Sequence, residues 1–341
     1  MEYGLYVPAA ITAIGSPEIA RSIARARQPL PDGERDAQFE MLRDFLPLCD
    51  RNGFHLSLFA ERHLGSDLGA WMLAGAFASA FENMRALVAV HPGLIDPALV
   101  AKFAASLDRM VRKRMGINIV NGWYEEEFRM FGGTVLEGEA RYRRSSEFID
   151  ILRGLWREDV FSYQGEHYRL DNARLMLKPA TPTPPQIYSV SNTDRGRDFI
   201  AESSDWWFMS LPREPETTHA DAMRFVEESI ADMTRRAARF GRKVRFGLNP
   251  FMALGDSAEA ALKDTVDAIF AFEPEGERTV ERIRQIERRM LPATKAGLIG
   301  TARDVRAQVR RFDDMGIELL LLKFVPDLDN VRRLGAEVLM A

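Results

Sequence analysis

The sequence predicts a (β/α)₈ barrel, in which eight parallel strands alternate with helices around one core. Short apolar runs alternate along the chain with segments of helical period, as in strand–helix units. The apolar runs are continuous, which is typical of parallel sheets that helices cover on both faces. The chain has 341 residues, of which 46% are hydrophobic, enough for a single domain over residues 1–341. A doubly wound open sheet competes, but no glycine-rich dinucleotide turn follows the first strand.

The first half of the chain supplies four candidate strands. Each contains a short run of Leu, Ile, Val, Phe or Tyr. In order along the chain, they are Tyr3–Pro8, Phe54–Ala60, Ala86–Pro92 and Met115–Asn121. Helical periodicity follows over Phe39–Asn52, Pro97–Met110 and Glu139–Trp156.

The second half repeats the pattern. Its candidate strands are again short and apolar, and they are Gln186–Ser191, Asp205–Ser210, Arg245–Leu254 and Glu318–Phe324, with Trp206 and Trp207 expected in wall and core. Helical periodicity covers Asp221–Gly241 and Ala302–Gly316.

Three segments are additional to the strands, helices and short loops of a minimal barrel. Residues 23–36 are a polar insertion, and residues 271–297 are a charged helical insertion that could act as a lid. Residues 159–185 contain a predicted hairpin around Gln164-Gly165 and then a proline-rich stretch. Because insertions after barrel strands gather at the carboxyl-end face, we expect them to shape a site there.

Composition narrows the class of protein. The net charge of −4 and the lack of a long Lys/Arg run argue against a nucleic-acid partner. No apolar stretch reaches the length of a membrane span, and the opening MEYGLYVPAA lacks a basic region, so we expect a cytoplasmic protein. The single Cys49 cannot form an internal disulfide, and the five His show no metal-ligand spacing, so no metal site is predicted.

Polar residues gather where the fourth predicted strand ends. Asn118 lies in the strand, Asn121 and Gly122 follow at its carboxyl end, and Trp123 could wall a pocket. An Asn amide both donates and accepts hydrogen bonds, which suits the edge of a flat heterocycle. Glycine lets another group approach the backbone closely. These residues indicate a site for a planar ring.

Other titratable residues near strand ends have two interpretations. Glu125 to Glu127 open the next helix, where the helix dipole alone is a sufficient reason for carboxylates, although Glu127 could point into a cleft. His91 ends the third strand and could assist proton transfer, and His63 follows the second strand; both could equally be structural.

A series of motifs runs along most of the chain. NIVNGWYEEEF is followed by EARYRRSSEFIDILRGLW, FSYQGEHYRL, GLNPFMALGDSAEAA and LIGTARDVRAQV. In their order and spacing they resemble the bacterial luciferase-like family of flavin-dependent monooxygenases. The resemblance is strongest to the subgroup of dimethylsulfone, alkanesulfonate and pyrimidine-ring-opening monooxygenases. The family fold is a (β/α)₈ barrel with insertions, in agreement with the strand count.

The resemblance implies roles for individual residues. It places Asn118 and Glu127 at the flavin ring, the pair Arg141 and Tyr142 along the flavin site, and Glu61 and Arg62 where the backbone packs against the ring.

The turn after the fifth predicted strand is a candidate phosphate site. Ser191, Asn192 and Thr193 offer hydroxyls, an amide and free backbone N–H groups at the start of a helix. An ordinary N-cap is the alternative on these residues alone. The family turn is glycine-rich with two serines, which Asn192 and Thr193 replace, while Val190 and Ser191 stand for the glycines.

The resemblance also bears on the substrate. Asn249 and Phe251 stand where alkanesulfonate monooxygenase has an Arg and a His, and only Lys295 remains near the shortened arginine loop. The Tyr expected after the last strand is replaced around Val325. A pocket without cations favours a neutral, compact substrate such as a sulfone.

The implied function is a two-component monooxygenase. A separate NAD(P)H-dependent flavin reductase would supply FMNH₂, which reacts with O₂ to oxidise a small sulfone or related organosulfur compound. A dimer or tetramer is expected. The alternatives are an FMN-dependent monooxygenase of a heterocycle or halogenated ring, a deazaflavin-dependent reductase, and a non-catalytic flavin-binding protein.

Overall fold

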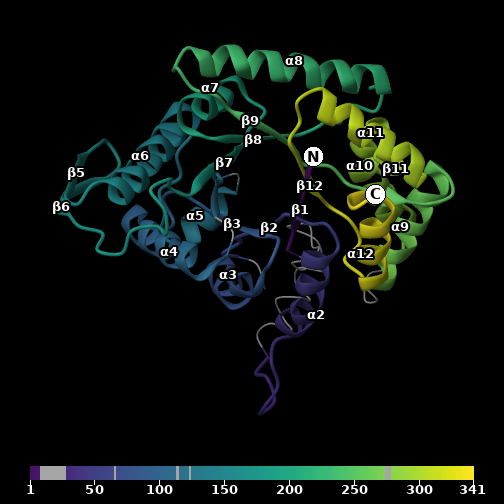
Figure 1. Cartoon of the computed structure of the whole chain (residues 1–341), viewed down its shortest axis with the longest axis horizontal. Helices are drawn as coiled ribbons and strands as arrows, with labels where there is room; N and C mark the ends of the chain where they lie inside the picture. The colour runs from purple at the N-terminus through teal and green to yellow at the C-terminus, as the bar shows by residue number, and fades with distance from the viewer. Residues whose placement is uncertain (8–27, 65–66, 113–114, 123, 273–277) are drawn as a thin grey trace.

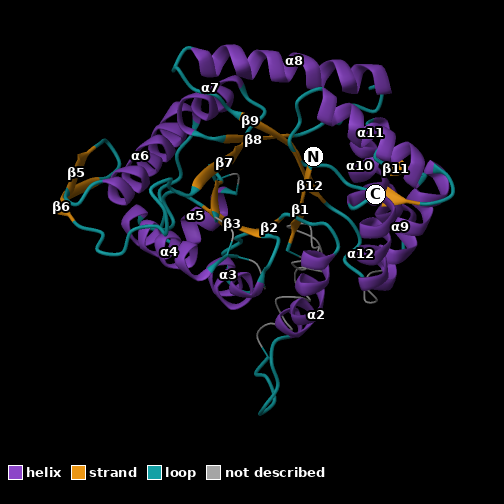
Figure 2. Ribbon diagram, viewed as in Figure 1, coloured by secondary structure: helices purple, strands orange, loops and turns teal. Residues whose placement is uncertain are grey.

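A computed structural model describes residues 1–7, 28–64, 67–112, 115–122, 124–272 and 278–341. Trp123 and parts of two predicted insertions, residues 23–27 and 273–277, lie outside the described residues. A ring of strands lies at the centre, and helices surround it (Figures 1 and 2). No helix within the described ranges is long and apolar enough to cross a membrane.

The strands close into a parallel barrel, which confirms the predicted fold class. Their order around the ring is β1-β12-β9-β8-β7-β4-β3-β2, and each predicted apolar run contains one of them. The barrel strands are β1 (Glu2–Tyr6), β2 (Leu56–Phe59), β3 (Arg85–Val90), β4 (Gly116–Ile119), β7 (Gln186–Val190), β8 (Trp206–Met209), β9 (Arg245–Leu248) and β12 (Leu319–Leu322).

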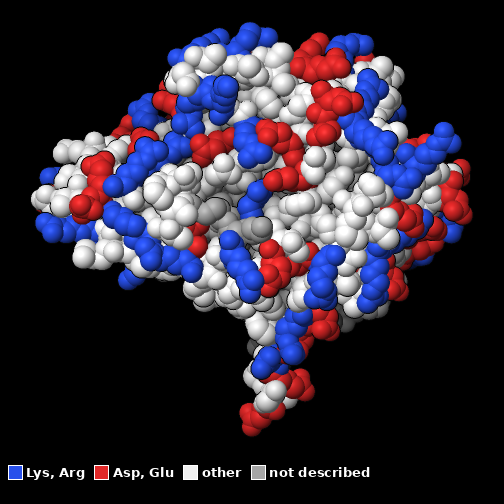
Figure 3. Space-filling view, in the orientation of Figure 1, with Lys and Arg blue, Asp and Glu red and all other residues white. Residues whose placement is uncertain are grey.

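Helices cover the outside of the barrel, and their caps follow from sequence. Asp36 accepts a hydrogen bond from Gln38 N at 2.9 Å, and Asp96 caps a helix that begins with Pro97. Lys and Arg are interspersed with Asp and Glu across the visible face of the molecule (Figure 3). The main helices are α2 (Ala37–Arg51), α3 (Ala70–Phe77), α4 (Pro97–Met110), α6 (Gly138–Arg157), α7 (Asp194–Ser203), α8 (His219–Ala238), α11 (Ala302–Asp314) and α12 (Leu328–Leu334).

Shorter or additional helical elements complete the chain. They are the 3₁₀ turn η1 (Ala78–Ala80), α5 (Glu125–Met130), α9 (Ala258–Phe272), α10 (Val280–Lys295) and the π-helical turn η2 (Gly335–Leu339).

Large apolar side chains fill the barrel interior. The Tyr188 and Trp206 rings stack at 5.2 Å between centroids, and Phe208 lies 5.5 Å from Tyr188. Leu56, Leu58, Leu87, Ala89, Leu319 and Leu321 complete this inner cluster. Trp207, by contrast, belongs to the separate outer cluster of buried residues. The interior is therefore a packed core, and a ligand site has to lie at an end of the barrel.

Glycines make room for the inner rings. A Cβ at Gly116 would lie 2.7 Å from Tyr188 Cε2, and one at Gly247 would lie 2.8 Å from Phe208 Cδ1. Both distances are shorter than carbon–carbon contact allows, so the interior aromatics depend on the absence of these side chains.

Polar side chains occupy the amino ends of the strands. Arg85 pairs with Glu2, the Trp206 indole N–H donates to Gln186 at 3.0 Å, and the Arg245 guanidinium lies 4.0 Å from the Trp206 ring. These interactions involve five strands at the amino end, β1, β3, β7, β8 and β9. The carboxyl end is thus the face where a site can form.

The predicted hairpin is confirmed as β5 (Phe161–Gln164) paired antiparallel with β6 (Arg169–Ala173). It follows α6 rather than a strand, so the rule for insertions after strands does not apply to it. Glu147 of α6 accepts hydrogen bonds from the N–H groups of Glu166, His167 and Tyr168, which ties the hairpin to the helix.

The prediction of one strand over Arg245–Leu254 was wrong. The barrel strand β9 ends at Leu248, and Pro250 interrupts the ladder because it lacks an N–H donor. The remainder forms β10 (Ala253–Leu254), which pairs in parallel with β11 (Ile299–Gly300), a strand that the sequence analysis missed. This small sheet closes the segment that contains α9 and α10.

The close contact at Gly116 predicts a stability effect. Replacing Gly116 with Ala should lower the free energy of unfolding by about 1–3 kcal/mol, because the new methyl group would push on the Tyr188 ring. Gly75→Ala is the matched control: Gly75 lies within α3 with open space around it, so this change should stabilise by about 0.5–1 kcal/mol. Urea denaturation measures both, and equal effects would contradict the interior packing.

Candidate active site

Asn118 faces the barrel interior at its carboxyl end. It pairs in register with Ala89 on one side and Tyr188 on the other, both members of the inner cluster. The side chain is only 5% exposed, yet its Oδ1 has no hydrogen-bond partner among the described residues. A buried carbonyl oxygen without a partner is costly, which is the arrangement expected when a ligand N–H completes it.

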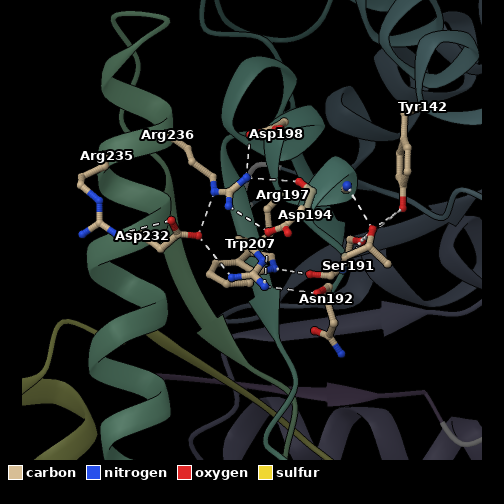
Figure 4. Close-up of polar contacts among 12 residues, drawn as sticks. Tyr142, Ser191, Asn192, Asp194, Arg197, Asp198, Trp207, Asp232, Arg235 and Arg236 are labelled. Carbon is tan, nitrogen blue, oxygen red and sulfur yellow. Dashed lines mark hydrogen bonds and ion pairs between the residues drawn. The ribbon is translucent and has the colours of Figure 1, made fainter. Parts of the chain in front are cut away.

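Three hydroxyls meet beside the end of β7. The Tyr142 hydroxyl, from α6, lies 3.0 Å from Thr193 Oγ1 and 3.3 Å from Ser191 Oγ (Figure 4). Burial alone would raise the pKa of Tyr142, but these hydrogen bonds and the charge of Arg141 outweigh it and lower the pKa. The cluster is therefore suited to surround an anion.

The hydroxyl cluster lies at the start of α7. Thr193 is the N-cap and accepts a hydrogen bond from Gly196 N at 3.1 Å. A Cβ at Gly196 would lie 1.8 Å from Ser191 Oγ and 2.8 Å from the Tyr142 hydroxyl, so only glycine permits this approach. Free N–H groups and the helix dipole favour a negative charge at this position.

An ionic network holds this turn from behind. Arg236 of α8 pairs with Asp194 at 2.9 Å and Asp198 at 2.7 Å on α7, and with Asp232 on its own helix (Figure 4). Asp232 also pairs with Arg197, whose guanidinium donates to the carbonyl of Asn192 at 3.4 Å.

The indole N–H of Trp207 fixes the same turn by donating to the carbonyl of Ser191 at 3.0 Å. The Asn192 side chain points away from the network, so its amide stays available (Figure 4). The structure thus brings together Tyr142, Ser191 and Thr193, three of the predicted cofactor residues, and adds supporting contacts that the sequence analysis did not find.

Arg141 lies between the hydroxyl cluster and the end of β4. It donates to the Gly122 carbonyl at 3.2 Å, and its guanidinium lies 5.1 Å from the Tyr142 ring. Its Nε is buried without a partner in the described part of the chain. A pocket of about 150 Å³ adjoins it, lined by Asn121, Gly122, Glu125, Phe128, Val135, Leu136, Glu137, Gly138, Arg141 and Arg144.

Glu127 and His91 form a buried pair at the ends of β3 and β4. One Glu127 carboxylate oxygen lies 3.2 Å from His91 Nδ1, and the other accepts a hydrogen bond from Leu64 N at 3.0 Å. The His63 ring stands perpendicular to His91 at 5.5 Å. Burial would raise the pKa of Glu127, but the contacts with His91 and Leu64 prevail and lower it. Glu127 therefore positions His91 and the loop after β2.

The remaining predicted cofactor residues have structural partners too. Glu61 accepts hydrogen bonds from the N–H groups of Arg62 and Ala70, the latter at the start of α3. Arg62 pairs with Asp67 at 2.9 Å. Both side chains thus hold the loop after β2, while the predicted packing of their backbone against a ring stays a prediction.

A cation lies near the predicted substrate residues Asn249 and Phe251, where the sequence analysis expected none. Lys323, just after β12, is largely buried with its Nζ 5.1 Å from the Tyr6 ring, and Asn249 Nδ2 donates to the Tyr6 hydroxyl at 2.6 Å. The backbones of Phe251 and Lys323 form an isolated parallel β-bridge. Lys295, at the end of α10, has its carbonyl 2.9 Å from a ring nitrogen of His219 on α8.

A sequence signal for Lys323 existed. Leu319 and Leu321 point into the barrel, so the period of two places residue 323 on the same face. The described residues contain no group of three or more His, Cys, Asp or Glu that could hold a metal ion.

Comparisons with known proteins identify the family and structures of similar fold. Residues 1–319 match the family described as luciferase-like monooxygenase. The chain is 30% identical over 325 residues to an FMNH₂-dependent dimethylsulfone monooxygenase of Pseudomonas putida, covering 87% of this chain and 86% of that protein. Its fold is similar to that of an EDTA monooxygenase from Chelativorans sp. BNC1, with a TM-score of 0.74 and 13% identity, over 100% of this chain and 92% of the other. The fold is also similar to that of an F420-dependent secondary alcohol dehydrogenase, with a TM-score of 0.70 and 16% identity, over 99% of this chain and 98% of the other.

The lowered pKa of Glu127 predicts a pH effect on stability. The ionised carboxylate contributes stability that is complete above its ordinary pKa of 4.5 and is lost as the pH falls through the lower pKa of the folded protein. Glu127→Gln should therefore cost about 1–3 kcal/mol of unfolding free energy near neutral pH and progressively less in acid.

Urea denaturation at about pH 7 and about pH 3.5 measures this difference. The control is Glu126→Gln, one residue earlier and exposed, which should change stability little at either pH. A Glu127→Gln effect that stays constant between the two pH values would contradict the contribution of the charge.

Proposed function

The chain belongs to the luciferase-like monooxygenase family, and from this premise we propose that it is a two-component enzyme that uses reduced FMN and O₂ to oxidise a compact organosulfur substrate such as a sulfone. A separate NAD(P)H-dependent reductase would supply the reduced flavin. The absence of a glycine-rich dinucleotide turn after the first strand supports that division of labour.

The observation that carries the proposal is the hydroxyl cluster at the start of α7. Three hydroxyls and a helix N-terminus form a cradle whose shape Gly196 makes possible. A phosphate monoester fits this donor set, since it offers several acceptor oxygens and a negative charge. Tyr142, Ser191 and Thr193 would therefore hold the FMN phosphate, with Arg141 beside them.

The ring end of the same cofactor would lie at the barrel mouth. The unpartnered Oδ1 of Asn118 can accept a hydrogen bond from a ring N–H, and the Asn121 Oδ1 is also buried without a partner among the residues described. Beneath Asn118, the inner cluster of Leu, Tyr, Trp and Phe forms an apolar floor. These features support a planar heterocycle with polar edges.

Reduced FMN supplies two electrons, so that one oxygen atom of O₂ enters the substrate and the other leaves as water. The protein's own contribution would be to bind, orient and exclude water. Buried His91, whose Nδ1 lies 3.2 Å from a Glu127 carboxylate oxygen, would direct its other ring nitrogen toward the ends of β3 and β4, where a part in proton transfer stays a prediction. The apolar floor keeps water out of the barrel interior.

The phosphate cradle predicts a ligand-specific defect. Tyr142→Phe removes one hydroxyl without changing the ring, so FMN affinity should fall about tenfold or more, because a hydrogen bond to a charged group is lost. Riboflavin lacks the phosphate, so its affinity should stay unchanged. Fluorescence titration of both flavins measures the two dissociation constants.

The control variant is Tyr163→Phe on the β5–β6 hairpin, away from the cradle. It should bind both flavins as the unchanged protein does. An equal loss for FMN and riboflavin in Tyr142→Phe would place the phosphate elsewhere.

An assay with a flavin reductase tests the reaction itself. With NADH, FMN and O₂, dimethylsulfone should be consumed, and mass spectrometry should detect its loss only when both proteins are present. Consumption of a pyrimidine or a halogenated ring instead would support the alternative monooxygenase. Flavin binding with no consumption of any substrate would support a non-catalytic flavin-binding protein.

A further inference from the structure

A lysine at the barrel mouth, Lys323, is not among the residues assigned to the cofactor. Lys323 follows β12 and shares the inward face of Leu319 and Leu321. Its neighbours are also inward-facing: the Tyr6 ring packs against the inner cluster and lies 5.1 Å from Lys323 Nζ, and Asn249 contacts the Tyr6 hydroxyl. The three residues come from β1, β12 and the end of β9, which are neighbours in the ring.

Lys323 is paired with no carboxylate anywhere in the described part of the chain. The nearby charges are the guanidinium groups of Arg213 and Arg289, which are of the same sign. Placing an ammonium group in a largely buried position without a counter-charge is costly, because it loses hydration. A structure tolerates this cost where a ligand supplies the missing partner.

The Tyr6 hydroxyl is oriented by Asn249. Asn249 Nδ2 donates to the phenol oxygen at 2.6 Å, which leaves the phenol proton free to be donated elsewhere. Burial raises the pKa of Tyr6, so the phenol remains protonated. Lys323 and Tyr6 thus present two donors side by side at the mouth.

These donors lie across the barrel from the predicted flavin contact. In the ring order β1-β12-β9-β8-β7-β4-β3-β2, β12 and β4 are four places apart in either direction. A ring held at Asn118 on β4 would therefore face Lys323 across the mouth. The space between the two walls is where a small substrate would sit.

We propose that Lys323 and Tyr6, oriented by Asn249, form a subsite that binds an acceptor oxygen of the substrate. It would select compact molecules that carry a sulfonyl oxygen or a small oxyanion and reject sulfur compounds without oxygen. This inference deepens the proposed function and rests on it for the identity of the group oxidised, but the binding of the oxygen can be tested without turnover.

The test uses the full chain and three compact probes. Methanesulfonate carries an oxyanion, dimethylsulfone carries neutral sulfonyl oxygens, and dimethylsulfide carries no oxygen. Calorimetry measures their binding with and without FMN. The unchanged protein should bind the first two and bind dimethylsulfide at least tenfold more weakly. If methanesulfonate binds and dimethylsulfone does not, the subsite accepts anions and the sulfone of the proposed function is wrong.

Substitutions assign the binding to the subsite. Lys323→Met should weaken methanesulfonate binding about tenfold or more, because a charge-assisted hydrogen bond is lost, while Lys323→Arg should retain most of it. Tyr6→Phe should weaken both oxygen-bearing probes. Lys102→Met, an exposed lysine on α4, is the matched control and should change nothing.

The FMN dissociation constant separates the two proposals. It should be the same in all four variants, because none of these side chains belongs to the phosphate cradle. If the unchanged protein binds methanesulfonate but no FMN, the proposed function fails and the subsite stands. If Lys323→Met and Tyr6→Phe bind every probe as the unchanged protein does, the subsite is overturned.

Titration gives a second readout that packing alone would not produce. Burial, and then the positive charges of Arg213 and Arg289, lower the pKa of Lys323 to about 8. Methanesulfonate affinity should therefore decline as the pH rises through about 8 in the unchanged protein but not in Lys323→Arg. The other groups facing Lys323 are Tyr6, whose pKa is raised, and the uncharged Asn249. Identical pH profiles for the two proteins would contradict a binding role for the ammonium.

Discussion

The filled interior of the parallel barrel is the constraint on which the rest of the structure depends. Because the strands are parallel, their carboxyl ends gather at one rim, and side chains there are brought together from distant parts of the chain. Stacked Tyr188 and Trp206 close the space below together with Phe208. Tyr188 fits because Gly116 has no side chain, and Phe208 fits because Gly247 has none. Polar side chains that face inward therefore lie above this core, at the rim, where a ligand can reach them.

The polar residues at and behind the rim fall into two groups according to their partners. Glu61, Glu127 and Arg236 are satisfied by the protein itself, and each ties one loop or helix to another. Asn118 and Lys323 lack a full set of partners among the described residues. Burying the first group costs little free energy, and its contacts make the site rigid. Burying the second group carries a desolvation cost that a bound ligand can offset.

Features of the fold and site could be predicted from the sequence where their residue pattern lies within a short stretch of chain. Apolar runs gave all eight barrel strands and Gln164-Gly165 gave the hairpin, because each pattern lies within a few residues. The prediction of a single strand over Arg245–Leu254 failed because Pro250 ends the hydrogen-bond ladder inside an apolar run. Among site residues, Ser191 and Thr193 form a local turn that can be read directly, whereas Tyr142 was found only through the family resemblance. Tyr6 and Asn249 are 243 residues apart, so nothing local in the sequence indicates their contact.

The two walls of the mouth explain how one fold can serve different substrates. On the proposed assignment, the hydroxyl cluster at α7 and Asn118 on β4 would hold the cofactor, while Tyr6, Asn249 and Lys323 lie on the opposite side of the ring. A change on the substrate wall can therefore leave cofactor binding intact. An EDTA monooxygenase and an F420-dependent secondary alcohol dehydrogenase share this fold, so the barrel itself does not determine the reaction. In this chain, on the proposed assignment, that choice would depend on the oxygen-bearing group of the substrate. This group would have to accept hydrogen bonds from the Lys323 ammonium and from the Tyr6 phenol that Asn249 orients.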